Sequence, residues 1–164
     1  MVKFLKEAKD YIIIVIVVVL IRTFVVTPAM VDGDSMNDTL LDGNLVLINK
    51  IGYRINGAKR FDIVVLKNEA DNDRIIKRVI GLPNEKIEYK DNKLYINDEE
   101  VKTNMDFKDT EDFTAETKDN EYFVLGDNRE VSKDSRILGN FKKEEILGKV
   151  NIRFYPLDRI GKIK

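Results

Sequence analysis

Histidine and cysteine are both absent from this chain of 164 residues. Without histidine, a Ser-His-Asp triad, an HExxH zinc site and an imidazole general base are all excluded. Without cysteine, disulfides, thiolate catalysis and cysteine-based zinc or iron–sulfur sites are excluded as well. Any acid–base chemistry must therefore come from Asp, Glu, Lys or Tyr side chains.

An excess of positive charge is also missing. The chain has 28 Lys and Arg residues against 29 Asp and Glu residues, a formal net charge of −1. Nucleic-acid-binding proteins usually carry a basic excess or stripe, so we expect no nucleic acid partner. The charged residues are interspersed, as on an ordinary solvated surface. The length suffices for one domain with a buried core, or for one domain and an anchor.

Long apolar runs are scarce, and the strongest is YIIIVIVVVLIRTFVV at 11–26. Residues 1–10, which precede it, are polar and include three lysines. A spanning helix needs about 20 apolar residues, with a range of about 17–25, so this run is slightly short. Arg22, near its end, could reach the lipid headgroups. We predict a transmembrane anchor over 11–28 in the cell membrane. The positive-inside rule then places 1–10 in the cytoplasm and 29–164 on the extracytoplasmic face.

Two other interpretations of this apolar run are open. A cleaved signal peptide has the same layout, with 27–29 as part of the cleavage region. A buried strand also fits a dense β-branched run, although the unbroken apolar stretch 12–21 is long for one strand of a small domain. The anchor interpretation makes the lipid bilayer a partner of this protein.

After residue 30 the apolar runs become short and are separated by turns, which predicts a mainly antiparallel β domain over 29–164. The runs 86–90 and 93–96 alternate around Asp91-Asn92, which is typical of a β-hairpin. Residues 141–148 form the best helical candidate, because a glycine ends the pattern. Residues 102–120 are expected to be a mobile loop or an edge, so a hairpin and loop insertion covers about 86–120. The other predicted strands are 45–48, 61–66, 74–80, 122–125 and 149–155.

Ser35 follows Asp32-Gly33-Asp34, a composition that is typical of turns. One interpretation is therefore a serine that only forms a turn. The other is a nucleophile, since Gly33 permits a sharp backbone that exposes Ser35 Oγ and directs its N–H toward a developing oxyanion. In a chain without histidine, the known base for such a serine is a lysine amine.

Lys77 is the lysine with the most apolar neighbours, in the segment IIKRVIG. A lysine base must be neutral, and lowering its pKa from ~10.4 to about 7–8 requires roughly 4 kcal/mol. Burial in an apolar pocket supplies such a shift. On a strand, Lys77 would share one face with Ile75 and Val79. The alternative is an edge-strand lysine that discourages aggregation.

Four motifs occur in order after the apolar run: VDGDSMNDTL (31–40), KRFDIVVLK (59–67), IIKRVIGLPNE (75–85) and FVLGDNREVSKDSRILG (123–139). With these motifs the chain resembles type I signal peptidases, in particular the short, single-anchor variety of Gram-positive bacteria. Those enzymes are membrane-bound Ser/Lys serine proteases that remove signal peptides from exported preproteins. The resemblance implies an antiparallel β-sheet catalytic domain and a reaction without metal or cofactor.

The resemblance implies a role for individual residues. Ser35 would be the nucleophile and Lys77 the general base. The hydroxyl of Ser132 would help orient the lysine amine. Three further polar residues would brace the site, the last two as an ion pair: Asp127, Asp134 and Arg136.

The same resemblance implies how substrate binds. A signal-peptide end would add alongside the segments near Val31 and 74–76 by β-augmentation. Shallow apolar pockets would accept small side chains at the −1 and −3 positions, hence Ala-x-Ala. The residues expected to line these pockets are Val31, Met36 and Ile76.

The chain departs from the family pattern at a few positions. Asp38 replaces a proline, which would loosen the turn after Ser35. Asn84-Glu85 replaces Gly-Asp, a mild change because asparagine tolerates positive φ, and Val131 replaces a common asparagine. Gly33 stands where another branch has an oxyanion-hole serine, so the hole would rest on the Ser35 N–H and a second donor that the sequence does not identify.

Two other functions remain open. One is a dedicated peptidase of the same family that processes pilins or a single substrate. The other is a membrane-tethered β-domain without catalytic activity.

Overall fold

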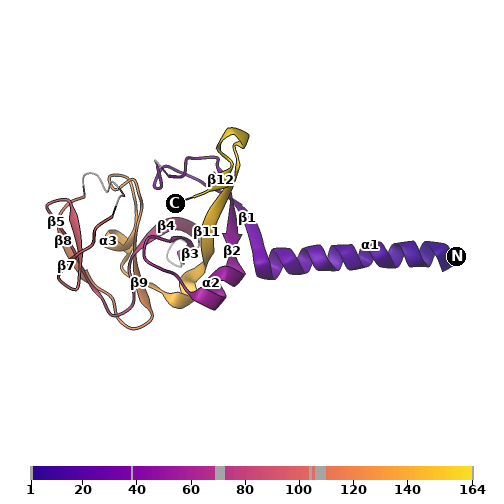
Figure 1. The fold of residues 1–164 in the computed structure, drawn as a ribbon, viewed down its shortest axis with the longest axis horizontal. Helices are drawn as coiled ribbons and strands as arrows, with labels where there is room; N and C mark the ends of the chain where they lie inside the picture. The colour runs from indigo at the N-terminus through magenta and orange to yellow at the C-terminus, as the bar shows by residue number, and fades with distance from the viewer. Residues whose placement is uncertain (1, 38, 69–72, 104, 106–109, 164) are drawn as a thin grey trace.

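The computed structural model describes residues 2–37, 39–68, 73–103, 105 and 110–163. The chain begins with helix α1 (Val2–Leu20), continues through a π-helical turn η1 (Ile21–Val25) and enters strand β1 (Val26–Met30). Figure 1 shows α1 projecting from a β-rich domain. Within the described part of the chain, no helix is long and apolar enough to cross a membrane.

The apolar run differs from its predicted form at its end. The predicted anchor extends over 11–28, whereas the helix ends at Leu20 and 26–28 belong to β1. These last residues are extended because they pair with β2 (Leu45–Asn49), for example Val26 with Asn49. A buried strand is wrong for 11–20, since every one of these side chains is 46% to 71% exposed on the helix.

The main sheet is antiparallel throughout, which confirms the predicted mainly β class. Among the described residues it has eight strands, in the order β1-β2-β11-β3-β4-β9-β10, with β12 paired to β11. Strands β3 and β4 lie in its centre, so side chains on both of their faces can be buried. The remaining bounds are β3 (Ile63–Asn68), β4 (Asp73–Gly81), β9 (Glu121–Leu125), β10 (Phe141–Lys142), β11 (Ile146–Tyr155) and β12 (Gly161–Lys162).

A second, smaller sheet occupies the predicted insertion. Its order is β7-β6-β5-β8, with bounds β5 (Lys86–Lys90), β6 (Lys93–Ile96), β7 (Glu99–Glu100) and β8 (Phe113–Glu116). Strands β5 and β6 form the predicted hairpin, and Asp91 and Asn92 have the positive φ angles that a tight two-residue turn requires. The predicted loop 102–120 therefore contains a strand, β8; residues 104 and 106–109 of that loop lie outside the described residues.

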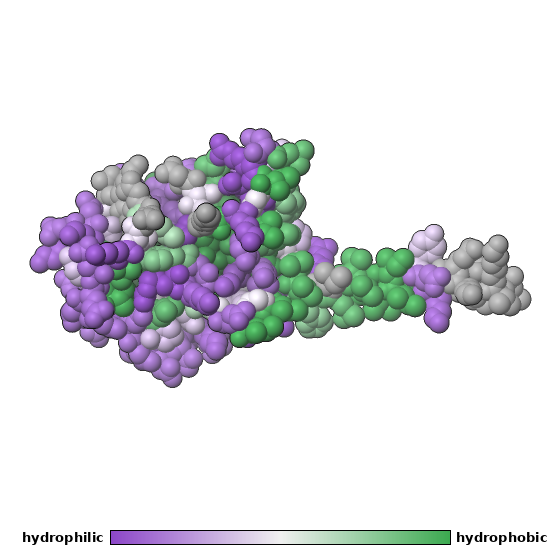
Figure 2. Space-filling view, viewed as in Figure 1, coloured by the Kyte–Doolittle hydropathy of each residue, from purple (hydrophilic) through white to green (hydrophobic). Residues whose placement is uncertain are grey.

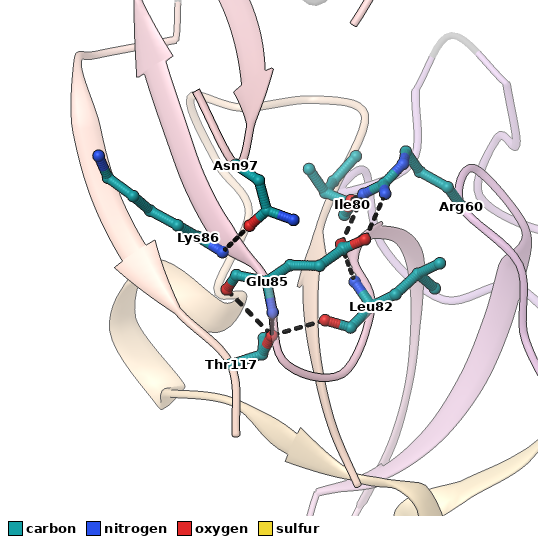
Figure 3. A network of polar contacts seen from close by, with 7 residues as sticks. All are labelled: Arg60, Ile80, Leu82, Glu85, Lys86, Asn97 and Thr117. Carbon is teal, nitrogen blue, oxygen red and sulfur yellow. Dashed lines mark hydrogen bonds and ion pairs between the residues drawn. The ribbon is translucent and has the colours of Figure 1, made fainter. Parts of the chain in front are cut away.

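Glu85 fixes the turn between the two sheets (Figure 3). Its carboxylate accepts hydrogen bonds from both terminal nitrogens of Arg60, at 2.6 and 2.9 Å, and from the N–H of Leu82 at 2.7 Å. Its own N–H donates to Thr117 Oγ1 at 3.0 Å. Asn84, beside it, has φ 61, so the asparagine adopts the positive φ that the sequence predicted it would tolerate.

The helix predicted over 141–148 is wrong. Residues 141–142 form β10, Lys143–Glu145 form a single 3-10 turn, and Ile146 begins β11. Strand pairing of Phe141 with Tyr122 and of Ile146 with Leu66 outweighs the local helical pattern. Helices α2 (Lys50–Asn56) and α3 (Ser135–Leu138) and the 3-10 turn η3 (Leu157–Arg159) were not predicted, and neither were the two-residue strands β7 and β12.

A buried apolar cluster lies directly beneath the loop that follows β1. Met36 and Leu40, from this loop, are 1% and 0% exposed and pack with residues of β2, β3 and β11. Burying side chains of this size stabilises a fold by about 1.5–3 kcal/mol each. The loop that carries Ser35 is therefore held against the sheet by its own apolar residues.

Candidate active site

Ser35 and Lys77 are brought together from positions 42 residues apart in the chain. A hydrogen bond joins Lys77 Nζ and Ser35 Oγ at 2.7 Å. Lys77 Nζ also donates to the carbonyl of Ile76 at 3.0 Å. Ser35 comes from the loop after β1, and Lys77 from the middle of β4.

Lys77 is buried by the position of β4 in the sheet. Strand β4 pairs with β3 along its length, and with β9 from Arg78 onward. Lys77 is 3% exposed, whereas a lysine that discourages edge-to-edge aggregation must be exposed, so that interpretation of Lys77 is wrong. Burial lowers the pKa of Lys77 from its ordinary value to about 8, while the negative charges of Asp134 and Asp127 act in the opposite direction. A lysine with this pKa is neutral in about a tenth of molecules at pH 7 and in about half at pH 8.

The loop around Ser35 is closed by local hydrogen bonds. Gly33 has φ 83, a left-handed conformation that favours glycine, and its N–H donates to Asp42 Oδ1 at 2.9 Å. The N–H of Asn37 donates to the carbonyl of Asp34 at 3.1 Å, which completes a turn across Ser35. The predicted loosening by Asp38 concerns a position that lies outside the described residues.

The loop after β9 holds the backbone of Ser35 from the other side. The N–H of Asn128 donates to the carbonyl of Ser35 at 3.1 Å, and its side-chain amide donates to the carbonyl of Asp34 at 3.2 Å. Gly126 makes this close approach possible, because a Cβ atom there would lie 2.5 Å from the Ser35 carbonyl oxygen. The two loops therefore fix each other.

Ser132 does not form the hydrogen bond expected of it. The resemblance implies that its hydroxyl orients the Lys77 amine, but Ser132 Oγ is buried and has no hydrogen-bond partner among the described residues. Its hydroxyl instead lies against Gly126, where a Cβ atom would come within 2.2 Å of Oγ. In this structure Ser132 is a packing neighbour of the Ser35 loop.

Asp134 and Arg136 form the ion pair that the sequence predicted. Asp134 Oδ1 accepts from Arg136 Nε at 2.9 Å, and Oδ2 accepts from Arg136 Nη2 at 3.0 Å. Asp134 is fully buried and also accepts from the N–H of Gly126 at 3.0 Å, while Arg136 donates to the carbonyl of Arg129 at 2.7 Å. The pair thus fixes the loop that touches Ser35.

Arg78 is a site residue that sequence reasoning missed. Its Nε and Nη2 each lie 2.7 Å from a carboxylate oxygen of Asp127, and Thr39 Oγ1 donates to the same carboxylate at 2.5 Å. The sequence analysis predicted that Asp127 braces the site, but it did not predict Arg78 as the partner of Asp127. The available signal was an arginine beside Lys77 in a buried apolar strand, because a buried guanidinium needs a carboxylate partner.

Two clefts meet at Ser35 and Lys77. One, of about 430 Å³, lies between the segments 28–32 and 73–77, and the predicted substrate-binding residues Val31, Met36 and Ile76 all line it. The other, also about 430 Å³, extends past Gly33 toward Lys133 and Leu138. Within the described part of the chain, no cluster of three or more acidic side chains could hold a metal ion.

An activatable serine, a buried amine and an open cleft on each side suit the cleavage of an extended chain, and comparisons with known proteins agree. The family model described as "Signal peptidase, peptidase S26" matches residues 4–155. Signal peptidase IB of Staphylococcus aureus is 38% identical, covering 92% of this chain and 91% of the relative. Signal peptidase I of Bacillus amyloliquefaciens is 41% identical, covering 96% and 91%.

A crystal structure of a signal peptidase I from Enterococcus faecalis matches 56% of this chain and 95% of its own, at 36% identity and a TM-score of 0.49. The family model and the two relatives each cover most of the chain, and the range 4–155 of the family model includes both segments that meet in the site. This chain belongs to the signal peptidase family of serine peptidases, peptidase S26.

Proposed function

We propose that this protein is a membrane-attached endopeptidase that removes N-terminal signal peptides from exported preproteins, with Ser35 as nucleophile and Lys77 as general base. The observation that carries the proposal is the 2.7 Å contact between Ser35 Oγ and the amine of Lys77, whose pKa is about 8. The relatives named signal peptidase support the choice of preproteins as substrates.

The proposed reaction has two halves. Neutral Lys77 takes the proton of Ser35 as Oγ attacks the scissile carbonyl, and the resulting ammonium gives that proton to the leaving amine of the mature protein. The signal peptide remains as an ester on Ser35. Lys77, neutral again, then takes a proton from water, whose oxygen attacks the ester carbonyl. As the ester bond to Ser35 breaks and the signal peptide leaves, the Lys77 ammonium returns that proton to Ser35 Oγ, which restores the free enzyme.

The cleft between 28–32 and 73–77 supports binding of an extended signal-peptide end. Pairing of β4 with β9 begins at Arg78, so residues 73–77 pair with β3 alone among the described strands and have a free edge on their other side. Strand β1 is the first of the described strands in the order of its sheet, so it also has a free edge. A peptide strand can therefore add between them. Alternate side chains of such a strand face the same wall, so the −1 and −3 residues would contact the cleft floor together. Because Val31 and Met36 are nearly fully buried there, the floor is shallow, which favours alanine at both positions.

Attachment to a lipid bilayer is proposed from the surface of α1. The side chains of residues 11–20 are apolar and exposed all around the helix, an arrangement that water disfavours and that hydrocarbon accommodates. The predicted orientation, with 1–10 cytoplasmic and the catalytic domain extracytoplasmic, is part of the proposal. The bilayer would then hold the cleft close to where a signal peptide emerges.

Cleavage of a preprotein with an Ala-x-Ala site, in detergent, tests the assignment. Ser35→Ala and Lys77→Met should each abolish turnover, while Lys93→Met, which changes an exposed lysine of the small sheet, should not. Substantial turnover by either site variant would refute the proposed pair. A panel of different signal peptides then separates a general enzyme from a dedicated one.

A further inference from the structure

A basic cavity lies beside the foot of α1, away from Ser35. Its volume is about 930 Å³, and it lies between α2, the start of β11 and Thr27 of β1. Four cationic side chains line it: Lys50, Arg54, Arg74 and Lys143. Among the described residues, Glu144 is the one acidic residue in the lining, so the cavity has an excess of positive charge.

The four cations have no carboxylate partner within the part of the chain that the structure describes. Among the described residues, none of the four forms an ion pair. Lys50 Nζ donates instead to a backbone carbonyl, that of Thr23, at 3.1 Å. Several like charges around one cavity repel each other, and an anion placed among them would offset that repulsion.

The cavity lies at the end of the domain from which α1 emerges. Thr23, which accepts the hydrogen bond from Lys50, belongs to the π-helical turn that directly follows α1. Helix α2 and this turn are in contact, and Figure 1 shows α2 beside the foot of α1. Lipid that surrounds the apolar part of α1 would therefore reach the mouth of this cavity.

Exposed apolar side chains flank the same basic residues. Ile55, which lines the cavity, is 75% exposed, and Phe24 and Ile51 are exposed nearby on the turn and on α2. Figure 2 shows hydrophobic surface where the domain meets the foot of α1. Basic groups next to exposed apolar groups match the headgroup and acyl regions of an anionic lipid.

We infer that this cavity binds the headgroup of an anionic phospholipid, such as phosphatidylglycerol. The phosphate would lie among Lys50, Arg54 and Lys143, and the acyl chains would run along the exposed apolar residues toward α1. The inference rests on the membrane attachment proposed above. Arg74 and Ile48 line both this cavity and the substrate cleft. A lipid bound in the cavity would therefore also hold the substrate cleft at the bilayer surface.

The test is native mass spectrometry of the full chain released from neutral detergent micelles that contain equal amounts of phosphatidylcholine and phosphatidylglycerol. The cavity variant is Lys50→Gln/Arg54→Gln/Lys143→Gln. The matched control, Lys90→Gln/Lys102→Gln/Lys118→Gln, removes the same charge from exposed lysines elsewhere. Thermal melting of each variant checks its folding. A second arm adds excess inorganic phosphate, which shares the anionic chemistry but has no acyl chains.

The wild type and the control should retain phosphatidylglycerol in preference to phosphatidylcholine, and the folded cavity variant should lose that preference by at least tenfold. Equal preference in the cavity variant, an equal loss in the control, or complete displacement by inorganic phosphate would each overturn the inference. A cavity variant that loses preprotein cleavage in neutral detergent but keeps the lipid preference of the wild type would also overturn the inference, since the cavity would then bind the substrate. Selective lipid retention by a wild-type protein that cleaves no preprotein would support the lipid site while refuting the proposed function.

Discussion

Arg78 and Asp127 form a two-pronged ion pair, with both N–O distances at 2.7 Å, one residue along β4 from Lys77. The pair connects the strand that carries the proposed base to the loop that holds the backbone of Ser35. Since Arg78 is 3% exposed, its charge has little access to water and depends on Asp127. We interpret Arg78 as a positioning residue, which acts on the reaction through the geometry of its neighbours.

Replacing one member of this pair should cost stability. Arg78→Met leaves the Asp127 carboxylate without its principal cation, and breaking one side of a buried pair typically costs about 3–5 kcal/mol. We expect a loss of this order in the free energy of unfolding, measured with urea. The control is Lys93→Met, which breaks the exposed pair with Glu100 and should change stability little. Equal effects of the two variants would show that Arg78 does not depend on its partner.

Lys77→Met should abolish cleavage and yet stabilise the protein at pH 7. The pKa of Lys77 is about 8 in the folded protein and 10.5 as the ordinary value, so the unfolded chain holds the proton more tightly. Burying the protonated amine therefore costs about 3 kcal/mol below pH 8, and this cost fades as the pH rises toward 10.5. The advantage of Lys77→Met in unfolding free energy should shrink from pH 8 upward. An advantage that stays constant between pH 7 and pH 9.5 would contradict the burial argument.

Gly126→Ala should displace Ser35. The added Cβ would lie 2.5 Å from the Ser35 carbonyl oxygen and 2.2 Å from Ser132 Oγ, so the two loops must separate. We expect a loss of about 1–3 kcal/mol in stability, typical of overpacking, and at least a tenfold decrease in kcat. Gly161→Ala is the matched control, because no atom lies within 4 Å of a Cβ there. Wild-type kcat in Gly126→Ala would argue against the tight contact.

Ile76→Ala should broaden the choice of signal peptide. Ile76 is half-buried and lines the cleft beside Ser35, and its truncation would deepen the floor. We expect kcat/KM for a substrate with Leu at −3 to rise relative to an Ala-x-Ala substrate, by about tenfold. An unchanged ratio would place the −3 side chain elsewhere.

The family resemblance predicted Ser35 and Lys77 as a pair, but the sequence did not predict the packing that brings the two residues together. Apolar neighbours and the absence of histidine favoured Lys77 as a base, whereas the turn composition around Ser35 left its role open, and the resemblance to type I signal peptidases assigned Ser35 as nucleophile. Their 2.7 Å contact depends on where β4 lies in the sheet and on a loop held by Asn128. Such contacts between distant segments leave no local pattern.

The predictions that differ from the structure, and the elements that were not predicted, also have reasons that lie in contacts between distant segments. Residues 141–148 look helical locally, but pairing of Phe141 and Ile146 with other strands decides their conformation. Helices α2 and α3 have seven and four residues, too short for a recognisable period, and depend on their caps, Asn49 and Asp134. The Ser132 prediction was carried over from relatives, and the packing around Gly126 leaves its hydroxyl without a partner among the described residues.

The rate at which Ser35 becomes acylated, followed by intact mass spectrometry in a single turnover with a peptide that spans a signal-peptide cleavage site, tests the central proposal most directly. With neutral Lys77 as the base, the rate should rise about tenfold per pH unit below pH 7 and level off above a pKa of about 8. Ser35→Ala should not be labelled, and Lys77→Met should be acylated at least a thousandfold more slowly, without this pH dependence. A pH-independent rate between pH 6 and 8, or rapid acylation of Lys77→Met, would contradict the proposed roles of Ser35 and Lys77.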